Sequence, residues 1–517
     1  MPKYDYDVIF IGTSNHALAG AAYLGKDLGL KCLMLERRAH IGAAAMTREI
    51  YPGYRGHVAA TGYANYIKGQ IVDDLDLEKR GVEMIKLDPW LTALFDDGTY
   101  ARIWEDPQRT YAEMEEKFGK AEADGYMAFR NRWAQVAMMM NVGIAGEPIK
   151  ISQLLGGLDS SAGFMEIGRD LLFTSLQRGM GEFFSNKKLV DMWNLWLEGV
   201  YDAPSAPGTL FAIVGHLLMN EQWTVNKGGL GKVAEALASA AVDYGAEIRC
   251  NTEVVEILTE GGKAYGVKTA DGEIITAKAV VSNAECAATV DMVGEDKFDA
   301  DYVRKAKNCW FEACGNTISF ALKAKPHFTG MPDDSLKGFI GFNCEREKAE
   351  KAFYQAHVGI IPEDPLMIGF LISEIDKGTY APEGGAVLTV YAFPNTWDFA
   401  DGSTWKDPKN KQKFYDNLVN SISKYSPDFK DLLLAVDGFT PGELQDEFGM
   451  TRGDHQHGMT SWGFMMGYRP IIGQPFLKPP IKNLYYVGAP QMSTGISGYG
   501  GLNLAKIVEQ DWAEINA

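Results

Sequence analysis

The sequence predicts an α/β protein in which a Rossmann-type domain is assembled from discontinuous segments and carries a second domain inserted between them. Two observations at the ends predict the first domain. A complete β-α-β unit opens the chain, and a buried strand with a glycine-rich turn and a helix closes it. The third observation is that the material between has a different texture, with short alternating strands and long helical stretches. Distant parts of the chain are therefore expected to share one parallel sheet.

The N-terminal unit is justified element by element. Residues 6–11 are typical of a buried parallel strand, and residues 12–16 form a tight turn. Small and apolar residues recur at helical spacing over 17–28, where Gly29 ends the helix. A second strand over 31–35 completes the unit just before Glu36.

The inserted material has its own expected elements. A strand meander is predicted over 85–102 and a mostly helical region over 109–200, with helices at 122–142, 170–177, 189–197 and 208–220. A further helix opens at the glycines of 228–231 and ends near 244. The later elements are strands at 247–250, 253–258, 264–269, 274–282, 316–322, 367–373 and 386–392, a helix at 411–425, a strand at 484–487 and a final helix from about Leu502.

These elements imply the domain boundaries. The first domain is expected to comprise residues 1–75, 221–300 and 440–517. The inserted domain, a mixed sheet capped by helices, is expected to comprise residues 76–220 and 301–439. Any substrate is expected to lie between the two.

Composition excludes several classes of protein. The chain has 517 residues and a formal net charge of −18, and this sign repels nucleic acids. The charge also disfavours attraction to anionic lipid, although a peripheral membrane contact is left open. The six cysteines form no C-x-x-C pair, so we expect no metal site and a reducing, cytoplasmic compartment. We also expect no signal peptide, and the longest apolar run, 210–219, is too short to span a bilayer.

The first turn carries a degenerate dinucleotide motif. Against G-x-G-x-x-G/A, the chain has Gly12, Ser14 and Ala17 at the three defined positions. Gly12 makes the turn, Ala17 lets helix and strand approach, and the helix N-terminus attracts a pyrophosphate. Glu36 follows Gly12 by 24 residues and ends the second strand, where a carboxylate accepts hydrogen bonds from an adenosine ribose.

The continuation of this motif resembles one cofactor family. Residues 36–47 are similar to the E-R-R-x-x-x-G-G-x-x-x-T segment of the FAD amine oxidases and phytoene desaturases, with Ala43 at the second glycine. The resemblance continues in order and spacing to Gly498. Its further segments are 50–55, 96–98, 204–209, 227–231, 253–257, 281–284, 453–458, 469–470, 484–489 and 495–498. The chain therefore resembles a member of this superfamily, in its phytoene-dehydrogenase-like branch.

The resemblance implies FAD as the cofactor and assigns contacts along it. The implied contacts are Gly12, Ser14 and Ala17 at the pyrophosphate, Glu36 at the adenosine ribose, Arg37 and the Val254 backbone at adenine, Gly42, Ala43 and Thr47 toward the flavin, Gly488 and Ala489 at the ribityl–phosphate end, and Ile496 near the isoalloxazine. A second nucleotide fingerprint is absent from the sequence, so we expect oxygen or a quinone, rather than NAD, to accept the electrons.

Three residues are candidates for the proton acceptor in catalysis. His57 lies in a segment that approaches the cofactor in relatives, His455 lies just before the C-terminal flavin segment, and Tyr499 lies in the glycine-rich turn. Each can instead be structural. Arg55 and Arg469 could hold a substrate carboxylate or satisfy backbone carbonyls. A stretch rich in methionine and aromatics could line an apolar chamber or form an ordinary helical core; it comprises 138–140, Phe164, Phe173, Phe183, Phe184, Trp193 and Trp196.

The resemblance predicts an enzyme that dehydrogenates its substrate. Hydride passes from a substrate carbon to flavin N5, a neighbouring carbon loses a proton, and a double bond forms. The expected substrate is mainly apolar, an isoprenoid or a small alicyclic compound. The alternatives are amine oxidation on the same fold, flavin-dependent isomerisation without net redox, and a non-enzymatic FAD-bearing interaction protein. The oligomeric state is left open.

Overall fold

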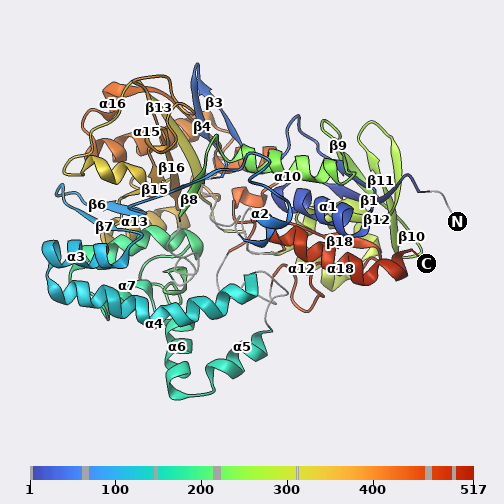
Figure 1. Cartoon of the computed structure of the whole chain (residues 1–517), viewed down its shortest axis with the longest axis horizontal. Helices are drawn as coiled ribbons and strands as arrows, with labels where there is room; N and C mark the ends of the chain where they lie inside the picture. The colour runs from blue at the N-terminus through green and yellow to red at the C-terminus, as the bar shows by residue number, and fades with distance from the viewer. Residues whose placement is uncertain are drawn as a thin grey trace.

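The computed structural model describes residues 4–60, 69–144, 150–213, 223–309, 311–312, 314–459, 469–491 and 497–516. Figure 1 shows two sheet-centred halves side by side, with a group of helices below the second. Both chain ends lie in the half that holds the first sheet. This α/β architecture confirms the predicted fold class.

The first sheet is built from strands far apart in the sequence. Its order is β10 (Val254–Glu260), β11 (Lys263–Thr269), β12 (Ile274–Ser282), β1 (Tyr6–Ile11), β2 (Cys32–Leu35) and β9 (Glu247–Arg249), with β18 (Leu484–Tyr486) also paired to β12. Pairing from β18 through β12, β1 and β2 to β9 is parallel. Parallel pairing aligns the carboxyl ends of these strands at one edge, which is where ligands bind in open α/β sheets.

Helices cover this sheet on the side of α1. The helices in that layer are α1 (Asn15–Leu28), α2 (Gln70–Asp74), α10 (Gly231–Asp243) and α18 (Tyr499–Ile515). α1 and α18 pack at the distance of backbone contact, because a Cβ on Gly20 would lie 3.3 Å from the Gly501 Cα. The Gly500 backbone N–H donates to Nδ1 of His16 at 3.1 Å. The other face packs against α11 (Cys286–Val293), and α12 (Ala300–Lys307) follows along the chain.

The second sheet is mainly antiparallel. Its order is β17 (Leu433–Gly438), β13 (Asn316–Leu322), β16 (Ala386–Phe393), β15 (Leu366–Phe370), β14 (Phe339–Phe342), β6 (Leu91–Leu94) and β7 (Tyr100–Ile103). One face packs on α15 (Pro408–Tyr425) and α16 (Phe429–Leu432). The opposite face, which we call the inner face, carries Ser319, Thr389, Tyr391, Ile368 and Phe370. The strand alternation therefore separates an outer apolar core from a more mixed inner surface.

Short ribbons and loops join the halves. β3 (Thr47–Tyr51) pairs with β4 (Tyr54–His57), and β5 (Met84–Lys86) pairs with β8 (Thr224–Asn226). β4 lies against β13 and β16 of the second sheet. The remaining helices in these connections are α8 (Lys187–Asp191), α13 (Arg346–His357), α14 (Ile372–Ile375) and α17 (Pro441–Phe448).

The predicted helical region has more breaks than its pattern indicated. Its helices are α3 (Pro107–Phe118), α4 (Lys120–Ile144), α5 (Ile151–Leu158), α6 (Ala162–Phe173), α7 (Leu176–Gly181) and the 3-10 helix η1 (Met192–Gly199). The helix predicted over 170–177 is wrong as one element, because Ser175 caps α7 by accepting from the Arg178 backbone N–H. Most of the predicted helix over 189–197 is the 3-10 helix η1. The helix predicted over 208–220 lies partly outside the described residues.

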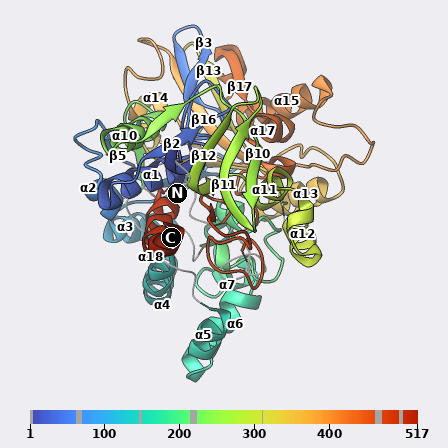
Figure 2. The same cartoon turned by 90° about the vertical axis from the view of Figure 1, so that its right-hand side faces the viewer.

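Two of these helices project from the body. Figure 2 shows α5 and α6 as an arm that extends away from both sheets. Phe164 and Phe173 lie on this arm and are exposed, so they do not line an internal chamber. Trp193 and Phe184 are buried in the core, and the side chains of 138–140 lie outside the described residues.

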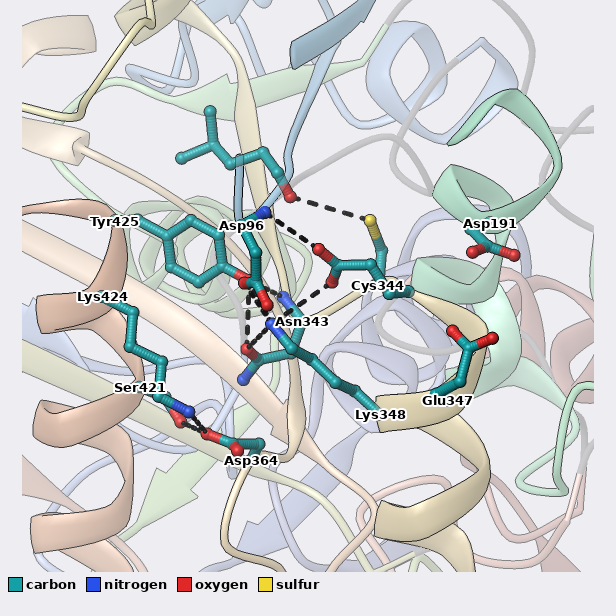
Figure 3. Close-up of polar contacts among 12 residues, drawn as sticks. Asp96, Asp191, Asn343, Cys344, Glu347, Lys348, Asp364, Ser421, Lys424 and Tyr425 are labelled. Atoms are coloured by element: carbon teal, nitrogen blue, oxygen red, sulfur yellow. Dashed lines mark hydrogen bonds and ion pairs between the residues drawn. The ribbon is translucent and has the colours of Figure 1, made fainter. Parts of the chain in front are cut away.

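A polar network fastens the outer helices to the second sheet (Figure 3). The Tyr425 hydroxyl, at the end of α15, accepts from the Asn343 backbone N–H at 3.1 Å and from the Lys348 Nζ at 3.0 Å, and it donates to the Asn343 side chain. Lys348, on α13, also pairs with Asp96 in the loop after β6. Each of these groups comes from a different element, so the network holds them in one register. Among the described residues, no helix combines the length and apolarity that crossing a membrane requires.

The contact between α1 and α18 is open to test with Gly501→Ala. An added Cβ would overlap the His16 carbonyl and the Gly20 nitrogen, which are backbone atoms and cannot turn aside. We expect a loss of about 3 kcal/mol in the free energy of unfolding, measured with urea. Gly156→Ala in α5 is the matched control, because its Cβ meets nothing within 4 Å. We expect that variant to gain about 0.5–1 kcal/mol. Equal stability of the two variants would contradict backbone contact between α1 and α18.

Candidate functional site

Three loops meet at the carboxyl ends of β1, β12 and β18. Gly12 has φ +96° and Gly488 has φ +120°, and both lie against the side chain of Asn283. A Cβ on Gly12 would lie 3.2 Å from the Asn283 Cβ, and one on Gly488 would lie 3.3 Å from its Nδ2. Side chains at either glycine would crowd this junction, so bare backbone faces the edge of the sheet.

Ser14 has a defined role at the position of the missing motif glycine. It is the N-cap of α1, with φ −63° and ψ 165°, and its Oγ accepts from the Ala17 backbone N–H at 3.4 Å. The same hydroxyl donates to Oδ1 of Asn283. Ser14 therefore begins α1 and joins the loops after β1 and β12. The first turn of α1 still presents its N-terminal N–H groups and positive potential beside Gly12.

A buried carboxylate lies at the end of β2. Glu36 is 4% exposed, and its Oε2 accepts from the Thr13 backbone N–H at 3.2 Å and from the Thr13 hydroxyl at 2.7 Å. Its Oε1 accepts from the Arg38 backbone N–H at 3.1 Å. Arg37 points elsewhere, because its guanidinium donates to the Glu447 carbonyl at 2.6 Å. The guanidinium that flanks Glu36 belongs to Arg38.

The segment after Arg38 turns sharply beside α10. Gly42 has φ +91°, and a Cβ there would lie 2.6 Å from that of Ala234. Ala43 has φ +50°, so it adopts the left-handed conformation in which the resemblance expects glycine. Thr47 then fills the space beside Gly229, whose φ is +97°.

This chain's own residues fit the dinucleotide part of FAD. The edge offers a bare-backbone cradle at Gly12 and Gly488, a helix N-terminus for phosphate, and a buried carboxylate for a ribose. Val254 begins β10 just beyond Thr252, whose N–H donates to the Glu36 carbonyl, so it lies on the adenosine side. Ala489 directly follows Gly488 in the cradle. Ile496, predicted near the isoalloxazine, lies outside the described residues.

His57 lies between the cofactor segments and the second sheet. It is fully buried, and its ring nitrogens lie 3.3 Å from the Thr47 Oγ1 and 3.2 Å from the Tyr380 hydroxyl. Burial lowers the pKa of His57 to about 4, so the ring is neutral near pH 7. Its carbonyl accepts from the Ser319 Oγ at 2.7 Å, and that hydroxyl lies 2.7 Å from the Thr389 Oγ1. His57 thus joins the flavin-side segment to the inner face.

His455 reaches the same inner face from the other side. Its Nδ1 and Nε2 lie 2.9 and 2.8 Å from the Tyr391 hydroxyl, and the two rings pack with centroids 4.6 Å apart. His457 turns away and contacts the buried carboxylate of Glu285 through Nδ1 at 3.1 Å. The two histidines therefore face different groups and form no common site.

Tyr499 differs from its expected position in a turn. It is the first residue of α18, three residues before the predicted start at Leu502, because Gly498 at φ +81° ends the turn earlier. Its half-buried ring packs on the helical core around α1, and burial raises the pKa of its hydroxyl. Arg469 is satisfied by the backbone, since its guanidinium donates to the carbonyls of Gln456, His457, Gly458 and Pro490.

A narrow cavity opens between η1 and the inner face. Its volume of about 10 Å³ leaves room for one water molecule. The walls are mainly apolar and aromatic, with three polar side chains. The lining residues are Trp196, Glu198, Phe339, Ile368, Gly369, Phe370, Thr389 and Tyr391. Because Thr389 also contacts Ser319, the cavity is continuous in packing with the segment that carries His57.

Glu198 is the functional candidate that sequence reasoning did not identify. It is 5% exposed, and burial raises the pKa of its carboxyl to about 8. The sequence around it, Trp193 to Gly199, has the pattern of an apolar core helix with a glutamate near its end. The signal available was a single carboxylate among tryptophans and leucines, which is rare in cores.

Metal chemistry has no counterpart in the described part of the chain. There, no group of three or more His, Cys, Asp or Glu side chains is placed to hold an ion. The six cysteines are free thiols.

Comparison with known proteins gives one family. The family described as flavin containing amine oxidoreductase matches residues 18–348. Pyridine nucleotide-disulfide oxidoreductase domain-containing protein 2 of Mus musculus is 25% identical over 98% of this chain and 94% of its own. A limonene dehydrogenase polypeptide of Castellaniella defragrans is 26% identical over 98% of this chain and 94% of its own. The structure of an oxidoreductase from Methanosarcina mazei, 15% identical, superposes with a TM-score of 0.60 over 97% of this chain and 100% of that one, and supports the fold.

The left-handed conformation of Ala43 predicts a stabilising substitution. Ala43→Gly removes a Cβ that costs roughly 1–2 kcal/mol at φ +50°, while glycine adds some unfolded-state entropy. We expect a net gain of about 0.5–1 kcal/mol in the free energy of unfolding. Ala44→Gly, at the next residue and without positive φ, is expected to lose stability instead. Urea unfolding of both variants measures the difference, and a loss in Ala43→Gly as large as that in Ala44→Gly would contradict the strain.

The raised pKa of Glu198 predicts a pH-dependent stability difference. Between pH 4.5 and about 8, the folded protein keeps the Glu198 proton while the unfolded chain releases it, so rising pH favours unfolding. Glu198→Gln cannot titrate. We expect its stability relative to the unsubstituted protein to rise by ~1.4 kcal/mol per pH unit across this window and to level off above it. Urea unfolding at several pH values measures this, and a difference independent of pH would refute a buried neutral carboxyl.

Proposed function

Since the chain belongs to the family of flavin-containing amine oxidoreductases and is an FAD-dependent oxidoreductase, we propose that it dehydrogenates a mainly apolar substrate. The substrate class is an isoprenoid or a small alicyclic compound, and the product carries a new carbon–carbon double bond. The small substrate and an electron acceptor, oxygen or a quinone, are the partners in this proposal.

One observation carries the proposal. The cavity on the inner face is walled by Trp196, Phe339, Ile368 and Phe370, and it adjoins the flavin-side segment through Thr389, Ser319 and the His57 carbonyl. Apolar walls beside the cofactor segment favour a substrate that binds by burial rather than by charge. The limonene dehydrogenase name of one relative supports the same substrate class.

The neutral state of the site argues against amine oxidation as the first choice. An alkylammonium substrate would have to shed its hydration shell, and a neutral carboxyl offers it no counter-charge. Glu198 and His57 are both neutral near pH 7 because burial disfavours their charged forms. The resident groups therefore match a neutral hydrocarbon better than a cation.

The division of labour follows from this arrangement. Oxidised flavin, when bound, supplies a two-electron acceptor for hydride. The aromatic walls exclude water and hold the apolar substrate over the inner face. Thr47 and Tyr380 hold the neutral His57 ring in place through its two nitrogens.

The reaction class is tested by anaerobic mixing of the FAD-loaded protein with a neutral alicyclic alkene such as limonene. We expect the flavin absorption near about 450 nm to bleach as substrate is oxidised. A matched amine, cyclohexylamine, is expected to bleach it far more slowly.

The other outcomes separate the alternatives. Faster bleaching by the amine would support amine oxidation. Conversion of the alkene to an isomer with the flavin still oxidised would support isomerisation. Purified protein that stays colourless after incubation with FAD would contradict every flavin-dependent hypothesis.

A further inference from the structure

We propose that Glu198 is the catalytic acid–base of this enzyme and takes the proton that leaves the substrate during dehydrogenation. The inference rests on the proposed function and assigns a residue that the initial candidates, His57, His455 and Tyr499, do not include. Its basis is the position of the carboxyl in the cavity.

Glu198 occupies the wall of the cavity opposite the sheet. It lies near the end of η1, and the Gln456 Nε2 donates to its backbone carbonyl at 2.7 Å. Across the cavity are Thr389 and Tyr391 of β16. The side chain is thus held where a substrate packed on the inner face must touch it.

The surroundings set the charge of this carboxyl. The titratable groups that face it are Tyr391 on β16, Tyr201 just after η1, and Asp454 in the loop that carries His455. Gly315 lets the two tyrosines meet, since the Tyr391 and Tyr201 hydroxyls occupy the space of its missing Cβ. Burial among these groups raises the pKa of Glu198 to about 8.

The neighbouring groups are less suited to exchange a proton at neutral pH. His57 titrates only near pH 4, and its ring nitrogens already face Thr47 and Tyr380. Burial raises the pKa of the Tyr391 hydroxyl well above its usual value, so it stays protonated. A general base works best when its pKa lies near the operating pH, and Glu198 meets this condition.

The step balances in atoms and electrons. One substrate carbon loses hydride, with both electrons of its C–H bond, to oxidised flavin. The adjacent carbon loses a proton to the Glu198 carboxylate, and the electrons of that C–H bond become the second bond of C=C. The Glu198 carboxyl afterwards releases the proton to solvent, which restores the carboxylate.

The first test needs no substrate. Trp196 lines the same cavity, so its fluorescence reports the charge of Glu198. We expect tryptophan emission of the purified protein to change with pH with a midpoint near 8, and Glu198→Gln to abolish this transition. Glu347→Gln, an exposed carboxylate on α13, is the control and should keep it. Persistence of the transition in Glu198→Gln, or its absence from the unsubstituted protein, would overturn the assignment.

The second test follows flavin bleaching by limonene across pH. In the unsubstituted protein we expect the rate to rise with pH and to level off above about 8, as the carboxylate forms. Glu198→Gln should bind FAD normally but bleach about 10²–10⁴-fold more slowly, without this pH dependence. Glu198→Asp should recover part of the rate and a pH dependence with a different midpoint.

The outcomes distinguish the two proposals. Equal rates in Glu198→Gln and the unsubstituted protein would overturn the role of Glu198 and leave dehydrogenation intact. Absence of bleaching in the unsubstituted protein, with limonene and the other neutral alkenes, would overturn the proposed function and the role of Glu198 with it. A slow Glu198→Gln that keeps the full pH profile would assign the base elsewhere.

Discussion

The close approach of Gly12, Asn283 and Gly488 is the constraint on which the rest of the structure depends. These residues follow β1, β12 and β18, which lie far apart in the sequence but side by side in the sheet. Because Asn283 fills the space of both missing Cβ atoms, the three loops can meet only when all three strands are in register. The Rossmann-type domain is therefore complete only when its last segment returns, and the second half of the molecule must be accommodated between its segments.

The position of the second sheet follows from that closure. β3 and β4 leave the cofactor edge directly after Ala43, and β4 docks on β13. The Ser319 hydroxyl then ties the His57 carbonyl to Thr389. This short chain of hydrogen bonds places an aromatic cavity beside the segment expected to approach flavin. The same burial that makes the cavity apolar keeps His57 and Glu198 neutral, so the chemistry of the site follows from its packing.

Local patterns were sufficient for much of this description. The β-α-β unit, the strands at 274–282 and 316–322, and the helix at 411–425 all lie where periodicity indicated, because their residues are buried on regular faces. The family and FAD as cofactor were also correctly predicted from motif order. The break between α6 and α7 was not, because a serine cap interrupts an otherwise helical run. The early start of α18 at Tyr499 likewise depends on a glycine turn against α1.

The sequence by itself determined the fold class, the assembly of the cofactor domain from distant segments and the candidate residues of the dinucleotide cradle, because these rest on local spacing of glycines, an acid and apolar residues. Only the tertiary structure showed that Ser14 replaces a glycine as a helix cap, that Ala43 keeps glycine-like geometry, and that the Arg469 guanidinium is satisfied by backbone carbonyls. It also decided the state of Glu198. A glutamate has the same letter on a surface or in a core, and its pKa depends on the aromatic walls that distant strands bring around it.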